Sequence, residues 1–279
     1  MRIESIWQYP VKSMIGVKVP SAEVTFAGMV GDRIWAVRDE ERGGIRGAKK
    51  IAGLMKLAAE PLGDGGVAIT LPEGRRVLSS DPEVNEVLSD ALAHRVTLWP
   101  LQPAGDLDHY RRGPADTDDM MEEIRNLFGR ELDEPLPDFN VFPPEIIEFE
   151  SPPGTYLDAH PLVVMTTSAL DSLAAALPDS SVDIRRFRPN LVVDTGDEGG
   201  HPEFAWTGRR MAVGTAVIEI LDGCPRCVMV TRAVAPDVPE DRQVLRHIVR
   251  DLNQNVGVYA KIVEPGSFAV GDDVRLLQP

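Results

Sequence analysis

Cysteine and positive charge are both scarce in this sequence. Its 279 residues include only two cysteines, Cys224 and Cys227, which cannot build the disulfide framework of a small secreted protein and which fit a reducing compartment. Lysine and arginine number 29 against 44 aspartates and glutamates, which gives a formal net charge of −15. Nucleic-acid binding needs a basic surface that displaces counterions, so this composition predicts no nucleic-acid partner.

Long apolar runs are also missing. No stretch approaches the ~20 apolar residues that a membrane-spanning helix needs, and residues 1–7 lack the apolar core of a secretory signal. We therefore expect a soluble, cytoplasmic protein without a membrane partner. The composition is 43% apolar with 24 glycines and 23 prolines, which predicts a substantial core in one or two domains made of short strands and many turns.

Short extended runs bounded by turn residues predict strands in both halves of the chain. The first hundred residues hold the expected strands 2–9, 22–25, 34–38, 67–71 and 96–101. After residue 155 the expected strands are 162–165, 190–194, 211–213, 216–221, 228–231, 257–263 and 274–277. Many short strands with regular turns are typical of a barrel or a sandwich, so we predict a β-rich α+β fold with a few peripheral helices.

Apolar spacing and end signals predict four helices. Ser80-Asp81-Pro82-Glu83 resembles a capping box, and apolar residues follow it at helical spacing. The other expected helices are 118–128, ended by Gly129; a helix capped by Thr166 or Thr167 that runs to 177; and 242–252.

Residues 103–155 differ from the rest because they are acidic and, toward their end, rich in proline. We interpret this stretch as a long connection over the surface, with its charge on a solvated face. Its polar and aromatic run His109-Tyr110-Arg111 either reaches over a pocket or is ordinary surface.

The run Gly223-Cys224-Pro225-Arg226-Cys227 lies between two extended apolar runs. A neighbouring guanidinium favours the thiolate, which is both a nucleophile and a metal ligand. Structural zinc needs four ligands, and neither a second Cys-x-x-Cys nor histidines at ligand spacing are present. A thioredoxin-type pair should open a helix, whereas a β-branched run follows here. A single metal ligand with a bystander thiol, or two buried thiols that only pack, stay open.

Several basic residues stand in polar turns at the ends of expected strands. They are Lys12 beside Ser13; Arg33; Arg185, Arg186 and Arg188, which precede Pro189-Asn190; and Arg226 between the cysteines. Arginine, lysine, hydroxyl groups and turn amides are the groups that bind an anionic, phosphate-bearing ligand. The sequence does not show whether these side chains converge.

Together these motifs resemble the MOSC domain family. Tyr9-Pro10-Val11-Lys12-Ser13 and residues 31–37 resemble the opening of the MOSC N-terminal β-barrel domain. Four later segments resemble the MOSC domain: Phe187-Arg188-Pro189-Asn190, Trp206-Thr207-Gly208, Cys224-Pro225-Arg226-Cys227 and residues 264–272. By pattern the chain is similar to the mitochondrial amidoxime-reducing component and its bacterial counterparts. The resemblance implies a MOSC N-terminal β-barrel-like domain over 1–105, a variable connection over 106–155 and a MOSC β-barrel domain over 156–279.

The resemblance also implies a molybdenum cofactor, a pyranopterin phosphate that holds molybdenum through two sulfurs. In the family the cysteine after the arginine completes the sulfur ligation, which here is Cys227. The other positions that the resemblance assigns to cofactor binding are Lys12, Ser13, Arg33, Thr166, Thr167, Arg188, Asn190 and Arg226. Soft thiolates suit a metal that is already bound through sulfur.

The implied activity is reduction of N-hydroxylated compounds such as amidoximes, hydroxylamines and N-oxides. The sequence has no cysteines for an iron–sulfur cluster, so the electrons would come from a separate donor protein. Val230 and Arg232-Ala233-Val234 depart from the threonine and Asp-Pro that are usual after the metal cysteine, which implies a different pocket polarity. Two other interpretations remain: a cofactor carrier or sulfur-handling protein without turnover, and a cofactor-free dithiol or binding module.

Overall fold

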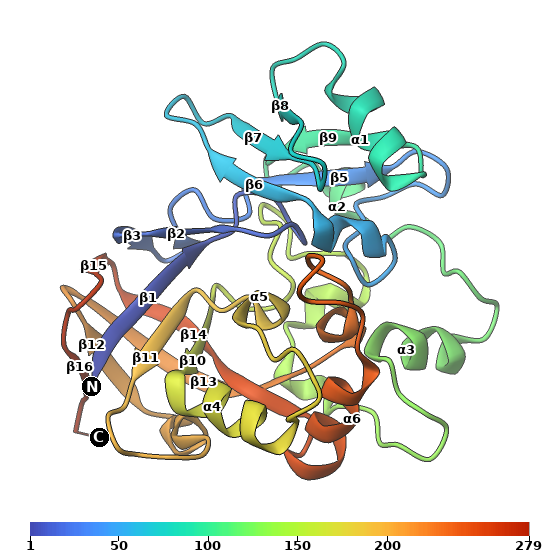
Figure 1. Ribbon diagram of the computed structural model, residues 1–279. Coiled ribbons are helices and arrows are strands. Elements are labelled where there is room, and N and C mark those ends of the chain that lie inside the picture. The colour runs from blue at the N-terminus through green and yellow to red at the C-terminus, as the bar shows by residue number, and fades with distance from the viewer. Residues whose placement is uncertain (279) are drawn as a thin grey trace.

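The computed structural model describes residues 1–278. Within them the chain forms six α-helices, five 3₁₀ helices and sixteen strands, so the predicted β-rich character is confirmed. The largest sheet has eight strands in the order β16-β12-β13-β14-β10-β11-β1-β2 (Figure 1). In that order they are Val274–Leu276, Arg210–Val213, Ala216–Pro225, Asn255–Glu264, Leu162–Thr166, Leu191–Asp194, Arg2–Gln8 and Val17–Val19.

Strands β10 and β11 run parallel, whereas the other neighbouring pairs of this sheet run antiparallel. A parallel pair needs a crossover connection, which α4 (Thr167–Ala176) and α5 (Ile184–Phe187) supply here. Thr166 accepts a hydrogen bond from the backbone N–H of Ala169, which confirms the predicted cap of α4. The last helix, α6 (Arg242–Asp251), precedes β14 and begins at its cap Asp241.

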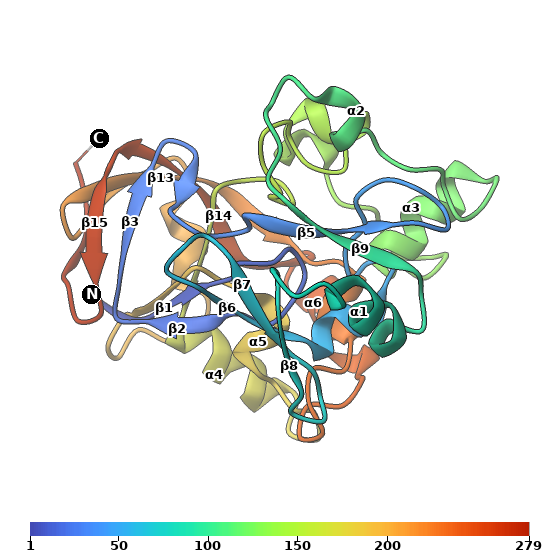
Figure 2. The ribbon, with the colours of Figure 1, turned by 90° about the horizontal axis from the view of Figure 1, so that it is seen from above.

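The first strands of the chain pair with strands of the C-terminal half. β1 lies between β11 and β2, and β3 (Ser21–Thr25) lies between β15 (Gly266–Ala269) and β4 (Gly28–Met29), as Figure 2 shows for β3 and β15. The first four strands of the chain therefore belong to sheets that also contain strands of the C-terminal half.

Residues 35–100 form a smaller unit above the large sheet (Figure 1). Its elements are β5 (Trp35–Asp39) paired with β9 (Val96–Pro100); β6 (Ala58–Pro61), β7 (Val67–Thr70) and β8 (Arg76–Leu78) in one sheet; the 3₁₀ helix Ala52–Lys56; and α1 (Val84–Leu92). The expected capping box is wrong, because the Asp81 carboxylate accepts from the N–H of Leu78 and closes a turn after β8. Glu83 precedes α1 without a side-chain cap.

The connection contains α2 (Leu107–Tyr110), α3 (Met120–Phe128) and the 3₁₀ helices Phe139–Val141 and Pro144–Ile147. Gly129 ends α3 with a φ of 63°, as predicted. The surface interpretation is wrong for His109 and Tyr110, which are buried against Tyr156. His109 Nε2 lies 2.6 Å from the Tyr156 hydroxyl, so a polar partner inside the protein makes this burial possible.

Two large hydrophobic cores underlie the two units. One lies beneath the large sheet, and the other fills residues 35–100 but also contains Met229, Val234 and Val238 from the C-terminal half. Residues Val228–Thr231 form a 3₁₀ helix, so the expected strand 228–231 is wrong. Its backbone bonds close within the turn, because the N–H of Val230 donates to the carbonyl of Cys227 and that of Arg232 donates to the carbonyl of Met229. Met229 and Val230 enter different cores. Among residues 1–278, no helix combines the length and apolar content that crossing a bilayer requires.

Candidate functional site

Cys227 lies on the wall of a pocket between the two halves of the chain, which we call the Cys227 pocket. The pocket has a volume of about 100 Å³. Arg33 and Lys49 reach it from the N-terminal half, and Phe128 and Phe142 reach it from the connection. The C-terminal half supplies Asp158, Ala159, His160, Val163, Arg186, Phe187, Arg188, Cys224, Pro225, Arg226, Met229, Val230 and Tyr259. The pocket thus brings the predicted thiol together with basic side chains that are far apart in sequence.

The two cysteines have different surroundings. Cys224 is 3% exposed and packs in a cluster with Tyr259, and burial raises the pKa of its thiol. Cys227 is partly exposed at the end of β13, directly before the 3₁₀ helix Val228–Thr231. Cys227 is therefore the thiol that a ligand in the pocket can reach, and Cys224 is held in the wall behind it.

Three of the predicted site residues have a left-handed backbone. Ser13, Arg33 and Arg188 have φ values of 68°, 51° and 56°, although none is a glycine. Side chains with a Cβ are strained in this region, and such residues cluster at binding sites where the surrounding structure holds them. With this backbone conformation, three polar side chains from three separate parts of the chain are buried in the interior.

Arg33 is held in place by a buried network. Its guanidinium pairs with Asp32 and lies 3.4 Å from Asn190 Oδ1, and it stacks 5.0 Å from the centre of the Tyr9 ring. Asn190 donates to Asp32 Oδ2 at 3.1 Å and to the carbonyl of Trp7 at 3.3 Å. The Tyr9 hydroxyl donates to the carbonyl of Pro189, and burial, opposed by nearby arginines, raises the pKa of Tyr9 well above its usual value. Asn190 therefore orients Arg33 and Asp32.

Two buried polar atoms beside this network have no hydrogen-bond partner within residues 1–278. They are the hydroxyl oxygen of Ser13 and Nη2 of Arg188. Arg188 donates through Nη1 to the carbonyl of Met14, and its guanidinium lies 4.3 Å from the centre of the Tyr9 ring. Burial, with the charge of Arg33, lowers the pKa of Arg188 to about 10. An anion at this position would satisfy both orphaned atoms and relieve the repulsion.

Lys12 and Asp158 form the main ion pair of the site. The Lys12 ammonium is 2.7 Å from Asp158 Oδ1 and also donates to Ser151 Oγ and the carbonyl of Tyr156, each at 3.2 Å. Burial lowers the pKa of Lys12, and Asp158 partly offsets this. Burial would raise the pKa of Asp158, but the charges of Lys12 and Lys49 hold it far below its usual value. Lys12 is therefore bound within the protein rather than directed at open space.

Arg226 and Arg130 brace the cysteine loop. Arg226 donates to the carbonyls of Phe187 and Val256, at 2.8 Å for the first, and Arg130 donates to the Arg226 carbonyl at 3.0 Å and to Gln254. Because these bonds end on backbone and amide oxygens, Arg226 contributes its positive charge to the pocket while its own position stays fixed.

Thr166 and Thr167 lie elsewhere. Thr166 is buried, donates to Glu203 Oε2 at 2.8 Å and caps α4, and Thr167 is the first residue of that helix. Neither threonine lines the Cys227 pocket, and Lys12, Ser13 and Asn190 do not line it either. In this structure Thr166 joins the end of β10 to the 3₁₀ helix Pro202–Trp206, which carries Glu203.

Sequence reasoning missed Lys49 and Asp158. Burial alone would lower the pKa of the Lys49 ammonium, but the nearby Cys227 sulfur and the carboxylates of Asp158 and Glu150 outweigh burial and raise that pKa. No motif marks either residue, because each gains its role from partners far along the chain. Tyr9 was within the quoted motif Tyr9-Pro10-Val11-Lys12-Ser13, so the aromatic residue before Lys12 was a signal that could have been used.

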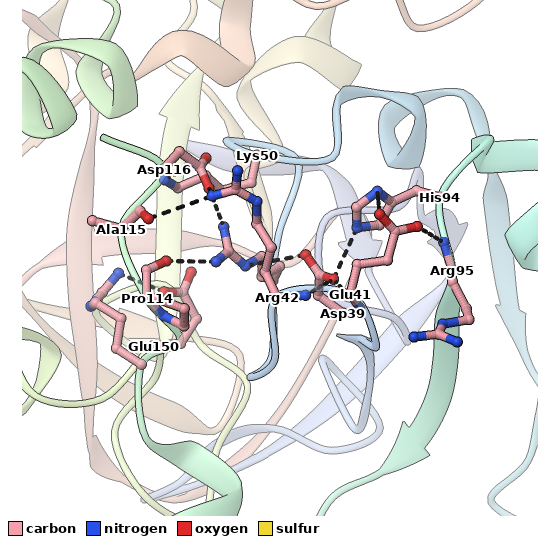
Figure 3. A network of polar contacts seen from close by, with 12 residues as sticks. Asp39, Glu41, Arg42, Lys50, His94, Arg95, Pro114, Ala115, Asp116 and Glu150 are labelled. Atoms are coloured by element: carbon pink, nitrogen blue, oxygen red, sulfur yellow. Dashed lines mark hydrogen bonds and ion pairs between the residues drawn. The ribbon is translucent and has the colours of Figure 1, made fainter. Parts of the chain in front are cut away.

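The segment that carries Lys49 is anchored by ion pairs. Asp116, from the connection, accepts from Arg42, from Arg46 and from Lys50, at 2.8, 2.9 and 2.7 Å respectively (Figure 3). Arg46 also lies 3.3 Å from Asp39, and both of these side chains are buried. The network ties residues 39–50 to the connection, which fixes the backbone on either side of Lys49.

Comparison with known families supports the same two-part organisation. The model of the MOSC N-terminal beta barrel domain matches residues 1–106, and the model of the MOSC domain matches residues 152–275. The chain belongs to the MOSC domain family. Its architecture is that of a two-domain MOSC protein.

Its curated relatives are distant in sequence. The mitochondrial amidoxime reducing component 2 of Macaca fascicularis is 24% identical, over 98% of this chain and 82% of the relative. The mitochondrial amidoxime-reducing component 1 of Homo sapiens is also 24% identical, over 99% of this chain and 82% of the relative. The crystal structure of the YuaD protein of Bacillus subtilis covers 98% of this chain and 93% of its own, at 10% identity and a TM-score of 0.45.

Proposed function

We propose that this MOSC protein binds the molybdenum cofactor and reduces N-hydroxylated compounds such as amidoximes, hydroxylamines and N-oxides. The observation that carries the proposal is the position of Cys227, a reachable thiol on the wall of a pocket that also contains Arg33, Lys49 and Arg188. The names of the relatives, amidoxime reducing components, supply the reaction class.

The side chains favour a metal that arrives with most of its ligands. Within residues 1–278 no group of three or more His, Cys, Asp and Glu side chains is arranged to hold a metal ion. A free zinc or iron ion would need such a group. A metal already bound through two cofactor sulfurs needs only one more soft ligand, and Cys227 offers it.

The surroundings offer two unpartnered groups to the phosphate of such a cofactor. Ser13 Oγ and Arg188 Nη2 are buried donors without partners, and a Cβ on Gly47 would lie 2.6 Å from Ser13 Oγ. Gly47 therefore leaves room beside the Ser13 hydroxyl that any larger residue would fill. We assign cofactor binding to Ser13, Arg33, Arg188 and Asn190, with Lys12 and Arg226 adding charge and Cys227 as the molybdenum ligand.

The described residues also suggest how a substrate is held. When bound, the cofactor supplies the two-electron reduction of an N–O bond. Phe128, Phe142 and Tyr259 give the pocket apolar walls that exclude water and hold the body of the substrate. Lys49 places a protonated ammonium near Cys227, where it can bind the oxygen of an N–OH group. The electrons would come from a separate protein, because the sequence has no cysteines to spare for an iron–sulfur cluster.

The test is to produce the protein with the cofactor available and to measure its molybdenum content and its reduction of benzamidoxime with a chemical donor. We expect molybdenum in the wild type and in Cys224→Ser, and a large loss in Cys227→Ser, with circular dichroism showing that all three are folded. The opposite behaviour of the two variants would contradict the ligand assignment. Bound molybdenum without reduction of any N-hydroxylated compound would instead indicate a carrier of the cofactor.

A further inference from the structure

A second cavity lies on the other side of Lys49. It has a volume of about 290 Å³, and we call it the Arg232 cavity. Its lining residues are Lys49, Lys50, Asp116, Glu123, Arg125, Asn126, Leu127, Gly129, Arg130, Val228, Arg232 and Arg242. Lys49 lines both cavities, and Val228 follows Cys227 directly, so the cysteine loop separates the two.

Three cations of this cavity form no ion pair with a carboxylate among the described residues 1–278. They are Lys49, Arg232 and Arg242, none of which has an Asp or Glu oxygen within 4.0 Å. Arg232 donates only to the carbonyl of Lys49, at 3.4 Å, and its Nε atom is buried without a partner. Arg125 and Arg130 add two more cations without a carboxylate partner, whose bonds end on carbonyls and on Gln254. Unpaired cations that converge are unusual in a chain of net charge −15.

The acidic residues of the cavity are already neutralised. Lys50 pairs with Asp116 and with Glu123, and Asp116 also accepts from Arg42 and Arg46 (Figure 3). Glu123 further accepts the backbone N–H of Asp116 at 3.2 Å. These carboxylates are therefore paired with cations, so the unpaired cations set the electric field inside the cavity.

We propose that the Arg232 cavity binds a small phosphate-type dianion, either free inorganic phosphate or the phosphate group of a small molecule. Arginine forks and a lysine ammonium match the geometry and charge of phosphate oxygens. The cavity is concave and large enough for a phosphate group. The connection, residues 103–155, carries many carboxylates, and these would repel a broad acidic protein surface. A small ion inside the cavity is repelled less, because solvent and salt screen the carboxylates outside it. The cavity shares Lys49 with the Cys227 pocket, but neither Ser13 nor Arg188 lines it.

The test is calorimetric titration of the purified chain with inorganic phosphate at low ionic strength, and separately with pyrophosphate and phenyl phosphate. We expect saturable binding with a Kd below ~1 mM. Arg232→Gln and Arg242→Gln should each weaken it about tenfold or more, as loss of one charge-assisted contact predicts. Tighter binding of phenyl phosphate than of phosphate would assign the site to small phosphomonoesters, and the reverse would assign it to the free ion.

Two control variants remove the same charge elsewhere. Arg210→Gln changes an exposed residue on β12 that is paired with Glu219, and Arg76→Gln changes an exposed residue on β8 that is paired with Glu60. Neither variant should change the phosphate affinity by more than about twofold, because salt screens charges that are distant from the cavity. Equal losses in Arg210→Gln and Arg232→Gln would show non-specific attraction and overturn the proposal. A loss in a further variant, Arg188→Gln in the Cys227 pocket, without a loss in Arg232→Gln would place the anion among the cofactor residues and overturn the proposal. Absence of saturable binding would also overturn it. No molybdenum is needed, so the outcome is independent of the proposed reductase activity.

Discussion

The pair Lys12–Asp158 makes a strong prediction about stability. The Lys12 ammonium is 1% exposed, whereas the Asp158 side chain is 37% exposed. Replacing Asp158 with asparagine keeps the shape and one acceptor but removes the charge that compensates a buried cation. Removing one partner of a fully buried pair costs about 3–5 kcal/mol. The partial exposure of Asp158 and the remaining amide oxygen reduce this figure, so we expect Asp158→Asn to lower the free energy of unfolding by about 2 kcal/mol.

A double variant isolates the electrostatic part. Lys12→Met/Asp158→Asn has no buried charge at this position, and we expect it to regain most of the stability that Asp158→Asn loses. Urea unfolding followed by circular dichroism gives the free energies of the wild type, of Lys12→Met, of Asp158→Asn and of the double variant. A coupling energy below about 0.5 kcal/mol would refute the reasoning, because pairs without interaction add to within that amount.

The pH dependence has a definite sign. The pKa of Asp158 is depressed in the folded protein, so its contribution is fully present above its unfolded pKa of about 3.9 and is lost as the pH falls through the depressed value. The stability difference between wild type and Asp158→Asn should therefore be constant above about pH 5 and narrow below about pH 4. A difference that widened in acid would contradict the assignment.

Two further predictions concern the thiols and the cap of α4. Iodoacetamide should alkylate Cys227 in the folded protein and Cys224 only after unfolding, because Cys224 is 3% exposed. Mass spectrometry of the alkylated peptides measures the labelling of each cysteine, and equal labelling of both in the folded protein would contradict the prediction. Thr166→Ala should lower the free energy of unfolding by about 1–2 kcal/mol, since it removes the cap of α4 and a partner of buried Glu203, while molybdenum content per folded chain stays unchanged. A loss of molybdenum in that folded variant would return Thr166 to the cofactor site.

Local sequence patterns predicted the elements whose signals are local. The strands now seen as β1, β5, β7, β9 and β13, the helix ended by Gly129, and the cap at Thr166 follow from alternation, turn residues and capping rules. The run Val228–Thr231 did not, because its β-branched residues favour a strand, whereas its backbone bonds locally within a 3₁₀ turn. β2 and β8 have only three residues each, and β6 has no β-branched or aromatic residue to mark it as a strand.

The features of the site also divide into those that sequence motifs predict and those that depend on contacts distant in sequence. Lys12, Ser13, Arg33, Arg188 and Asn190 could be named from motifs. The structure brings Arg33, Arg188 and Asn190 around Tyr9 and Asp32, whereas Lys12 pairs with Asp158. Their conformation could not be named, because a positive φ at a residue other than glycine depends on contacts that are distant in sequence. The role of Asp158 depends on Lys12, which is 146 positions away, and no sequence pattern encodes such a pair. The absence of a carboxylate partner for Arg232 likewise cannot be predicted from sequence, because it depends on which side chains the fold brings next to it.

The insertion of β1 between β2 and β11 has a consequence for synthesis and for fragments. β1 emerges from the ribosome long before β11, so this part of the largest sheet stays unfinished until most of the chain has been made. A recombinant piece limited to the matched MOSC domain would expose the bare side of β11, an open ladder of the kind that promotes aggregation. The two units of this protein are therefore best produced as one continuous polypeptide.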